Sequence, residues 1–115
     1  MKQFLYRIQP TRPTMLRDGL TEREAAAVGA HFEYLKGLVA QGVVLMAGRT
    51  QTADEHAFGI VIFVAASEAD ATLVVQNDPA VKQGVMKAEL FPYQVALWSA
   101  KDPTRGISSE ASPVD

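Results

Sequence analysis

The sequence contains no cysteine. This absence excludes disulfide bonds, thiol nucleophiles and thiolate metal sites, and it fits a reducing compartment, so we expect a cytoplasmic protein. No apolar run reaches the roughly 18 residues of a membrane span, and the start, MKQFLYRIQP, is too short and too interrupted for a signal peptide. The net charge of -2 gives no reason to expect nucleic acid or an anionic membrane as a partner.

The 115 residues are enough for one domain with its own hydrophobic core. Hydrophobic residues make up 48% and charged residues 21%, which is typical of a globular protein. From Ser99 onward the chain is polar and rich in serine and proline. We therefore predict a single α+β domain over residues 1–98 and a flexible polar tail over residues 99–115.

Alternating apolar residues predict a first strand over residues 3–9, and the prolines that follow predict a loop over residues 10–20. Thr21 and Glu24 have the spacing of a capping box, which predicts the start of a helix. The apolar period of this helix includes Val28, Phe32, Leu35 and Val39 and ends at Gly42, a typical C-terminal glycine.

Two β-rich runs over residues 43–51 and 58–66 predict a hairpin, and Ser67 is the expected N-cap of a second helix. A short helical turn is expected after Asp78, and a last strand lies within residues 85–97. Pro92 places that strand at a sheet edge or at a bulge. The order βαββαβ predicts a ferredoxin-like α+β sandwich, with one antiparallel sheet and two helices on one face.

The run from 58 to 66 is apolar on both faces of the predicted strand. One alternating set is Phe58, Ile60, Ile62 and Val64, and the other is Val61, Phe63 and Ala65. Because two helices cover only one face, the other would leave a large apolar patch. We therefore predict a homodimer in which a second copy of the chain covers that patch.

His31 lies beside the apolar stripe of the first predicted helix, and two interpretations are open. It is either a core histidine with satisfied hydrogen bonds or a general acid or base in a pocket. Asp78 is the best candidate for its partner, because a carboxylate facing the ring would orient it and fix its tautomer. Asp78 also has a purely structural interpretation as the N-cap of the turn that Pro79 begins. The sequence spacing alone does not bring the two residues together.

Arg49 ends the second predicted strand, directly after a glycine. It is either a solvated arginine at a strand end or a clamp for a carboxylate or phenolate of a substrate. His56 follows Asp54 and Glu55, but no spacing typical of metal ligands supports a metal site, and we expect none.

Several segments resemble the YciI-like (YCII-related domain) family when taken in order. They are HFEYLKGLVAQGVVLMAGRT, FGIVIFVA and DPAVKQGV, and the resemblance covers residues 3–97. It implies a ferredoxin-like fold paired into a dimeric α+β barrel, and a pocket with a His–Asp pair that falls on His31 and Asp78. Characterised members include an enzyme that removes chloride from a chlorinated hydroxyhydroquinone. This chain has Arg49 where the family often has proline, and its loop over residues 10–20 is longer than usual.

Two functions are therefore open. The first is a cofactor-independent enzyme that uses His31 and Asp78 for proton transfer on a small cyclic or phenolic anion, with Arg49 as the anion partner. The second is a non-catalytic dimer of the same fold that binds a small ligand or a partner protein.

Overall fold

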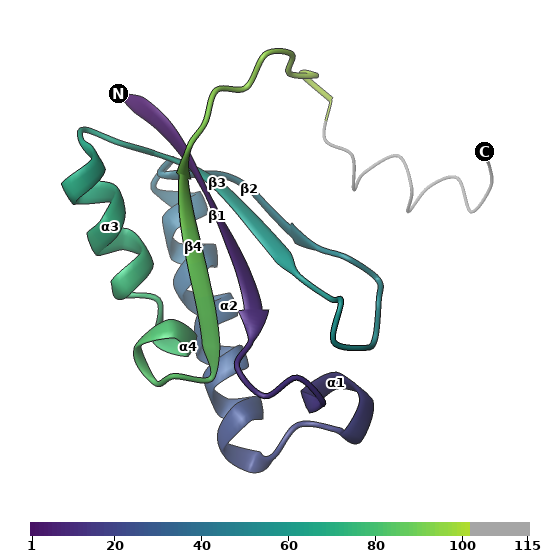
Figure 1. Cartoon of the computed structure of the whole chain (residues 1–115). Helices are drawn as coiled ribbons and strands as arrows, with labels where there is room; N and C mark the ends of the chain where they lie inside the picture. Colours follow the sequence, from purple (N-terminus) through teal and green to yellow (C-terminus); the bar gives the residue numbers. More distant parts are fainter. Residues whose placement is uncertain (102–115) are drawn as a thin grey trace.

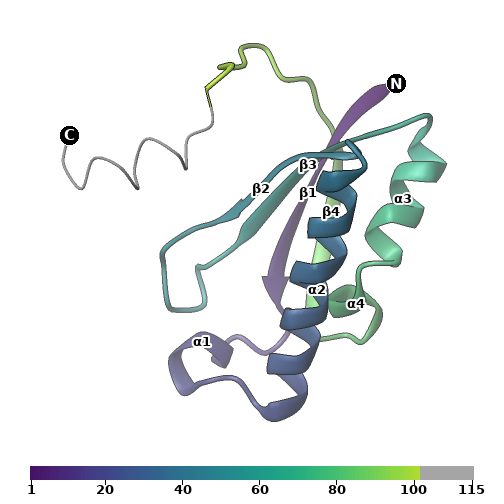
Figure 2. The same cartoon turned by 180° about the vertical axis from the view of Figure 1, so that it is seen from behind.

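The structure is a computed structural model that describes residues 1–101, and within them four strands form one antiparallel sheet (Figure 1). The strands are β1 (Lys2–Pro10), β2 (Val44–Arg49), β3 (Gly59–Ala65) and β4 (Met86–Pro92), in the order β2-β3-β1-β4. The helices are α1 (Met15–Asp18), α2 (Glu22–Ala40), α3 (Glu68–Gln76) and α4 (Pro79–Lys82). The two long helices, α2 and α3, cover the same face of the sheet (Figure 2). This is the predicted ferredoxin-like α+β sandwich.

Both predicted ends of α2 are confirmed. The Thr21 hydroxyl accepts a hydrogen bond from the Glu24 amide over 3.1 Å, and the Glu24 carboxylate accepts one from the Thr21 amide over 2.9 Å. At the other end Gly42 has a φ of 76°, which glycine adopts without steric cost. The strand with Pro92 lies at a sheet edge, as predicted, because β4 pairs only with β1 in the described sheet.

The core lies between the sheet and the helices. It includes Phe4 and Tyr6 of β1 and Val61 and Phe63 of β3, each at most 3% exposed. The rings of Tyr6 and Phe63 meet edge to face, with centroids 5.8 Å apart. Of the two alternating sets of β3, it is therefore the one with Val61 and Phe63 that faces the helices.

Phe32 and Val39 were expected on the buried stripe of α2, and this expectation is wrong. Their side chains are 63% and 52% exposed. They line a cavity between α2 and the sheet, which leaves them open to solvent. The loop expected over residues 10–20 also differs, because Met15–Asp18 form one helical turn with Met15 buried.

The sheet face opposite the helices is apolar at its centre. Ile62 is buried, Ile60 and Val64 are half-buried, and Met46 and Phe91 stay 38% and 42% exposed. We call this surface the open sheet face. Among residues 1–101 no helix is long and apolar enough to cross a membrane. Most of the predicted tail over residues 99–115 lies outside the described residues, so the tail remains a prediction.

Candidate active site

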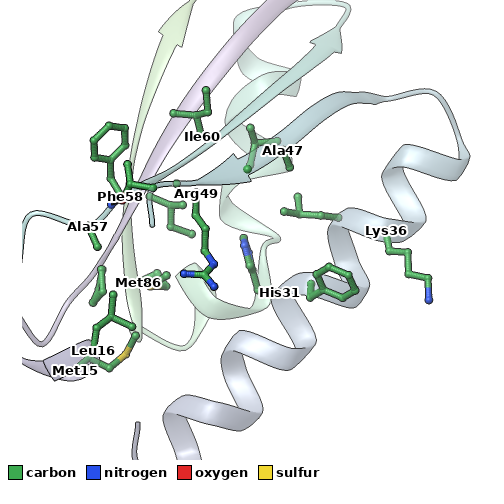
Figure 3. A pocket seen from close by; sticks show the side chains of 18 of the residues that line it. Met15, Leu16, His31, Lys36, Ala47, Arg49, Ala57, Phe58, Ile60 and Met86 are labelled. Carbon is green, nitrogen blue, oxygen red and sulfur yellow. Dashed lines mark hydrogen bonds between the residues drawn. The ribbon is translucent and has the colours of Figure 1, made fainter. Parts of the chain in front are cut away.

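A cavity of about 600 Å³ lies between α2 and the ends of β2 and β3 (Figure 3). Most of its wall is apolar, with Ile8, Leu35 and Met86 among the lining residues. Its polar lining comes from His31, Lys36, Arg49 and Thr50. This volume is within the range of about 300–1,000 Å³ for small-molecule sites. Apolar walls with a few polar groups are also typical of such sites.

The structure brings His31 and Asp78 into contact. Nδ1 of His31 lies 2.6 Å from Oδ2 of Asp78, although the two residues are 47 positions apart. The side chain of His31 is 16% exposed and that of Asp78 is fully buried. Because an ionised carboxylate only accepts hydrogen bonds, Nδ1 carries the proton and donates to Asp78. In a neutral imidazole of this tautomer the other ring nitrogen, Nε2, is the acceptor, and His31 is one of the residues that line the cavity.

Asp78 also fulfils its predicted structural role. Its Oδ1 accepts a hydrogen bond from the Ala80 amide over 3.0 Å, which caps α4. The two interpretations of Asp78 are therefore compatible, since one oxygen caps the helix and the other contacts His31. Pro79 at the first helical position fixes the backbone of this turn and thereby the direction of the carboxylate.

Tyr6 is a third member of this cluster, and the sequence analysis missed it. Its hydroxyl donates to Oδ2 of Asp78 over 2.7 Å, the same oxygen that His31 contacts. Burial raises the pKa of Tyr6 far above its usual range, and the charge and hydrogen bond of Asp78 raise it further. The phenol therefore stays protonated and acts as a fixed donor. Burial, followed by the charge of Asp78, also raises the pKa of Tyr34.

Arg49 lines the same cavity from the end of β2. It pairs with Gly59 on the face of the sheet that carries the helices, and Figure 3 shows its side chain extending toward His31. Gly59 itself allows the close approach of the strands here. A Cβ at that position would lie 3.1 Å from both the Gly48 carbonyl oxygen and Cγ2 of Ile8.

His56 lies away from this cluster, on the surface loop between β2 and β3. Its Nδ1 is 3.4 Å from Oδ1 of Asp54, and ligand atoms of Asp54, Glu55 and His56 lie within 4.8 Å of one another. All three side chains are largely exposed to water, an arrangement that is common for loop residues that bind no metal.

The fold and the contact of His31 with the buried Asp78 beside an apolar cavity define a small α+β protein with a candidate acid–base site. The sequence profile of the YCII-related domain matches residues 4–104, which is most of the chain, and the chain therefore belongs to the YCII-related domain family. No curated protein is similar enough in sequence to match this chain.

Two solved structures are similar in fold. One is 5-chloro-2-hydroxyhydroquinone dehydrochlorinase from Burkholderia phenoliruptrix, in complex with 2,5-dihydroxybenzoquinone. It is 23% identical, with a TM-score of 0.60 over 80% of this chain and 93% of that one. The other is an uncharacterised protein from Thermotoga maritima, 10% identical, with a TM-score of 0.50 over 80% of this chain and 95% of that one.

Proposed function

We propose that the protein is a cofactor-independent enzyme that transfers a proton to or from a small cyclic or phenolic anion. His31 is the general acid or base, Asp78 orients it, and Arg49 binds the negative charge of the substrate. The observation that carries this proposal is the 2.6 Å contact between a fully buried carboxylate and a histidine that lines an apolar cavity. The dehydrochlorinase of similar fold, whose structure holds 2,5-dihydroxybenzoquinone, supports a phenolic ring as the substrate type.

The geometry supports a simple sequence of proton movements. Nε2 of neutral His31 accepts a proton from a hydroxyl or an acidic C–H of the substrate, and the imidazolium that forms is stabilised by the adjacent Asp78 carboxylate. The guanidinium of Arg49 stabilises the anion left on the substrate. The Tyr6 hydroxyl donates a hydrogen bond to Oδ2 of Asp78 and keeps this carboxylate in place. General acid–base catalysis of this kind contributes about 10²–10⁴ in rate, and the low-polarity walls strengthen the charge interactions.

The test is hydrogen exchange in deuterated water. A panel of hydroxyquinols and enol lactones is incubated with the protein, and loss of exchangeable C–H signals or product formation is followed by proton NMR. We expect exchange with the wild type and a loss of about 100-fold or more with His31→Gln. The matched control is His56→Gln, which removes the second histidine of the chain from the exposed loop and should leave the rate unchanged.

Equal exchange rates for His31→Gln and the wild type would contradict a role of His31 as acid or base. Binding of panel members without any exchange would favour the second function, a non-catalytic ligand-binding dimer. In that case the contact between His31 and Asp78 would be a buried structural hydrogen bond.

We also propose that the protein forms a homodimer through the open sheet face. An apolar surface of this kind is rare on monomers. Arg7 lies within it, stacked 4.8 Å above the ring of Phe58 and 3.9 Å from Glu89, and its buried Nε has no hydrogen-bond partner among residues 1–101. A second copy packed on this face would cover the apolar side chains and bring further acceptors near Arg7, because a twofold interface places each surface against itself.

A further inference from the structure

The cavity has two different ends, with His31 and Arg49 between them (Figure 3). One end is closed by α1 and the neighbouring strands, and Met15, Leu16, Ala57 and Met86 lie there. Met15 and Ala57 are 2% and 5% exposed. The opposite end is open to solvent, since the lining residues Phe32 and Val39 are 63% and 52% exposed. A ligand that reaches His31 therefore meets a packed apolar wall on the side of α1 and open solvent on the other side.

The wall at the closed end is held in place by Arg12. Its guanidinium contacts both oxygens of Glu24, at 2.6 and 2.8 Å, and donates to the Gly19 carbonyl over 2.9 Å. Arg12 and Gly19 flank α1, so these bonds connect both sides of α1 to Glu24 in the first turn of α2. Met15 packs against Ala27 and Val85, and Leu16 packs beside that cluster. These contacts hold the wall of the closed end in place within the fold, and a wall held in this way lowers the conformational cost of binding.

The charge of the lining favours an anion. Among the described residues that line the cavity none is acidic, and the cationic side chain that extends toward His31 is that of Arg49. Lys36 belongs to the open rim, and its exposed side chain extends away from the cavity (Figure 3). The carboxylate of Asp78 is fully buried behind His31 and bound by three donors. The volume of about 600 Å³ also suits a ligand larger than a single ring, since pockets of this size enclose drug-sized molecules.

We propose that the site binds an amphipathic organic anion whose apolar body extends beyond one ring toward α1. Its negative group lies between His31 and Arg49, and the end of its apolar body contacts Leu16. Leu16 is then a specificity-determining residue that sets the length of the substrate. This inference rests on the proposed function of the same cavity and specifies its substrate class.

The test measures binding of 4-n-alkylbenzoates, from benzoate to 4-pentylbenzoate, by isothermal titration calorimetry. Each added methylene that enters the closed end should raise the affinity about fourfold, until the space is filled and the gain stops. Leu16→Ala should move that limit to longer chains and Leu16→Trp to shorter ones. Leu20→Ala is the matched control, because Leu20 lies beyond α1, is 39% exposed and does not line the cavity.

A second arm separates the anionic group from the apolar body. Arg49→Gln should weaken every member of the series by a similar factor and leave the gain per methylene unchanged. The same affinity for all chain lengths would overturn the inference, and so would two Leu16 variants that both behave like Leu20→Ala. Circular dichroism confirms folding of each variant before titration.

The outcomes also separate this inference from the proposed function. Binding needs no turnover, so a chain-length limit set by Leu16 with no hydrogen exchange in any compound would support the ligand class and contradict the enzyme. Exchange that depends on His31, together with equal affinity for all chain lengths, would support the enzyme and contradict the ligand class.

Discussion

The hydroxyl of Tyr6 donates a hydrogen bond to Asp78 over 2.7 Å and across 72 positions of the sequence. This bond joins the central strand β1 to the N-cap of α4, and both side chains are 0% exposed. The Asp78 carboxylate, which His31 contacts, is therefore held by Tyr6, a side chain that is itself fully buried in the core. His31 lies on α2 and has no hydrogen bond to β1 within residues 1–101. Tyr6 of β1 nevertheless helps to orient its ring, because it fixes the Asp78 carboxylate that His31 contacts.

Tyr6→Phe should destabilise the protein without changing its fold. The substitution removes a hydrogen bond to a charged acceptor, which contributes about 1.5–3 kcal/mol, and we expect the free energy of unfolding in urea to fall by that amount. Tyr93→Phe is the control, because Tyr93 is 44% exposed. A second readout is the NMR signal of the His31 Nδ1 proton, which should shift when Oδ2 of Asp78 loses its other donor. Equal losses for the two variants and an unmoved signal would contradict the role of Tyr6.

Alkaline pH should weaken the folded state partly through Tyr6. Burial, together with the charge and hydrogen bond of Asp78, raises the pKa of Tyr6 above the usual value near 10. Above that pH the unfolded chain loses the phenol proton while the folded chain keeps it, so the free energy of unfolding falls as pH rises. The free energy of unfolding, measured by urea denaturation at pH 8 to 11, should fall less steeply with pH for Tyr6→Phe than for the wild type. Parallel curves would show that Tyr6 ionises as readily in the folded protein as in the unfolded one.

The sequence predicted those parts of the fold that depend on local chemistry. The capping box of Thr21 and Glu24 follows from hydrogen bonds between neighbouring residues, and the glycine after α2 follows from its positive φ. The edge position of Pro92 follows from the amide hydrogen that proline lacks. It could not tell which face of β3 meets the helices, because both alternating sets are apolar. It also missed α1, since four helical residues between Pro13 and Gly19 have no periodicity to detect.

The site was predictable only in part. Spacing could not show that His31 and Asp78 meet, and only the resemblance to a family implied their contact. Tyr6 lies within the first predicted strand, over residues 3–9, and the alternating pattern gave it no role in the site. A signal was nevertheless present, because a tyrosine on the buried face of a strand needs a partner for its hydroxyl. The roles of His31, Asp78 and Arg49 in catalysis or binding remain predictions.

Acid pH should act on the ion pair that holds the closed end of the cavity. Hydrogen bonds from the Arg12 guanidinium hold the pKa of Glu24 at about 2, below its usual value of 4.5. A lowered pKa contributes stability above the unfolded value, and this contribution is lost as pH falls from about 4.5 to about 2. Glu24→Gln should remove this part of the acid dependence in thermal melts. Glu22→Gln, an exposed residue of the same first turn, should not, and equal behaviour of the two variants would contradict the assignment.

The proposed dimer gives a test of the open sheet face. Ile60 and Ile62 of β3 lie side by side with Leu5 and Arg7 of β1 on this surface. A stable interface buries at least about 1,000 Å² in total, so it must include the centre of the sheet. A buried unpaired carboxylate there is strongly unfavourable. Val64→Asp places one on this face opposite Gln3 of β1, and it should therefore shift the protein to monomers in sedimentation velocity at micromolar concentration.

The control for this prediction is Leu73→Asp, which places the same charge on the outer surface of α3. Leu73 is 54% exposed and lies on the helical side of the molecule, so its substitution should leave the sedimentation coefficient unchanged. A wild type that sediments as a monomer at micromolar concentration would contradict the dimer. So would a dimer that Leu73→Asp dissociates and Val64→Asp does not, because that result would place the interface on the helices. In a monomer the half-buried Ile60 and Val64 would stay in contact with water. Exposed apolar surface of this kind has a free-energy cost, which the pairing of two sheets removes.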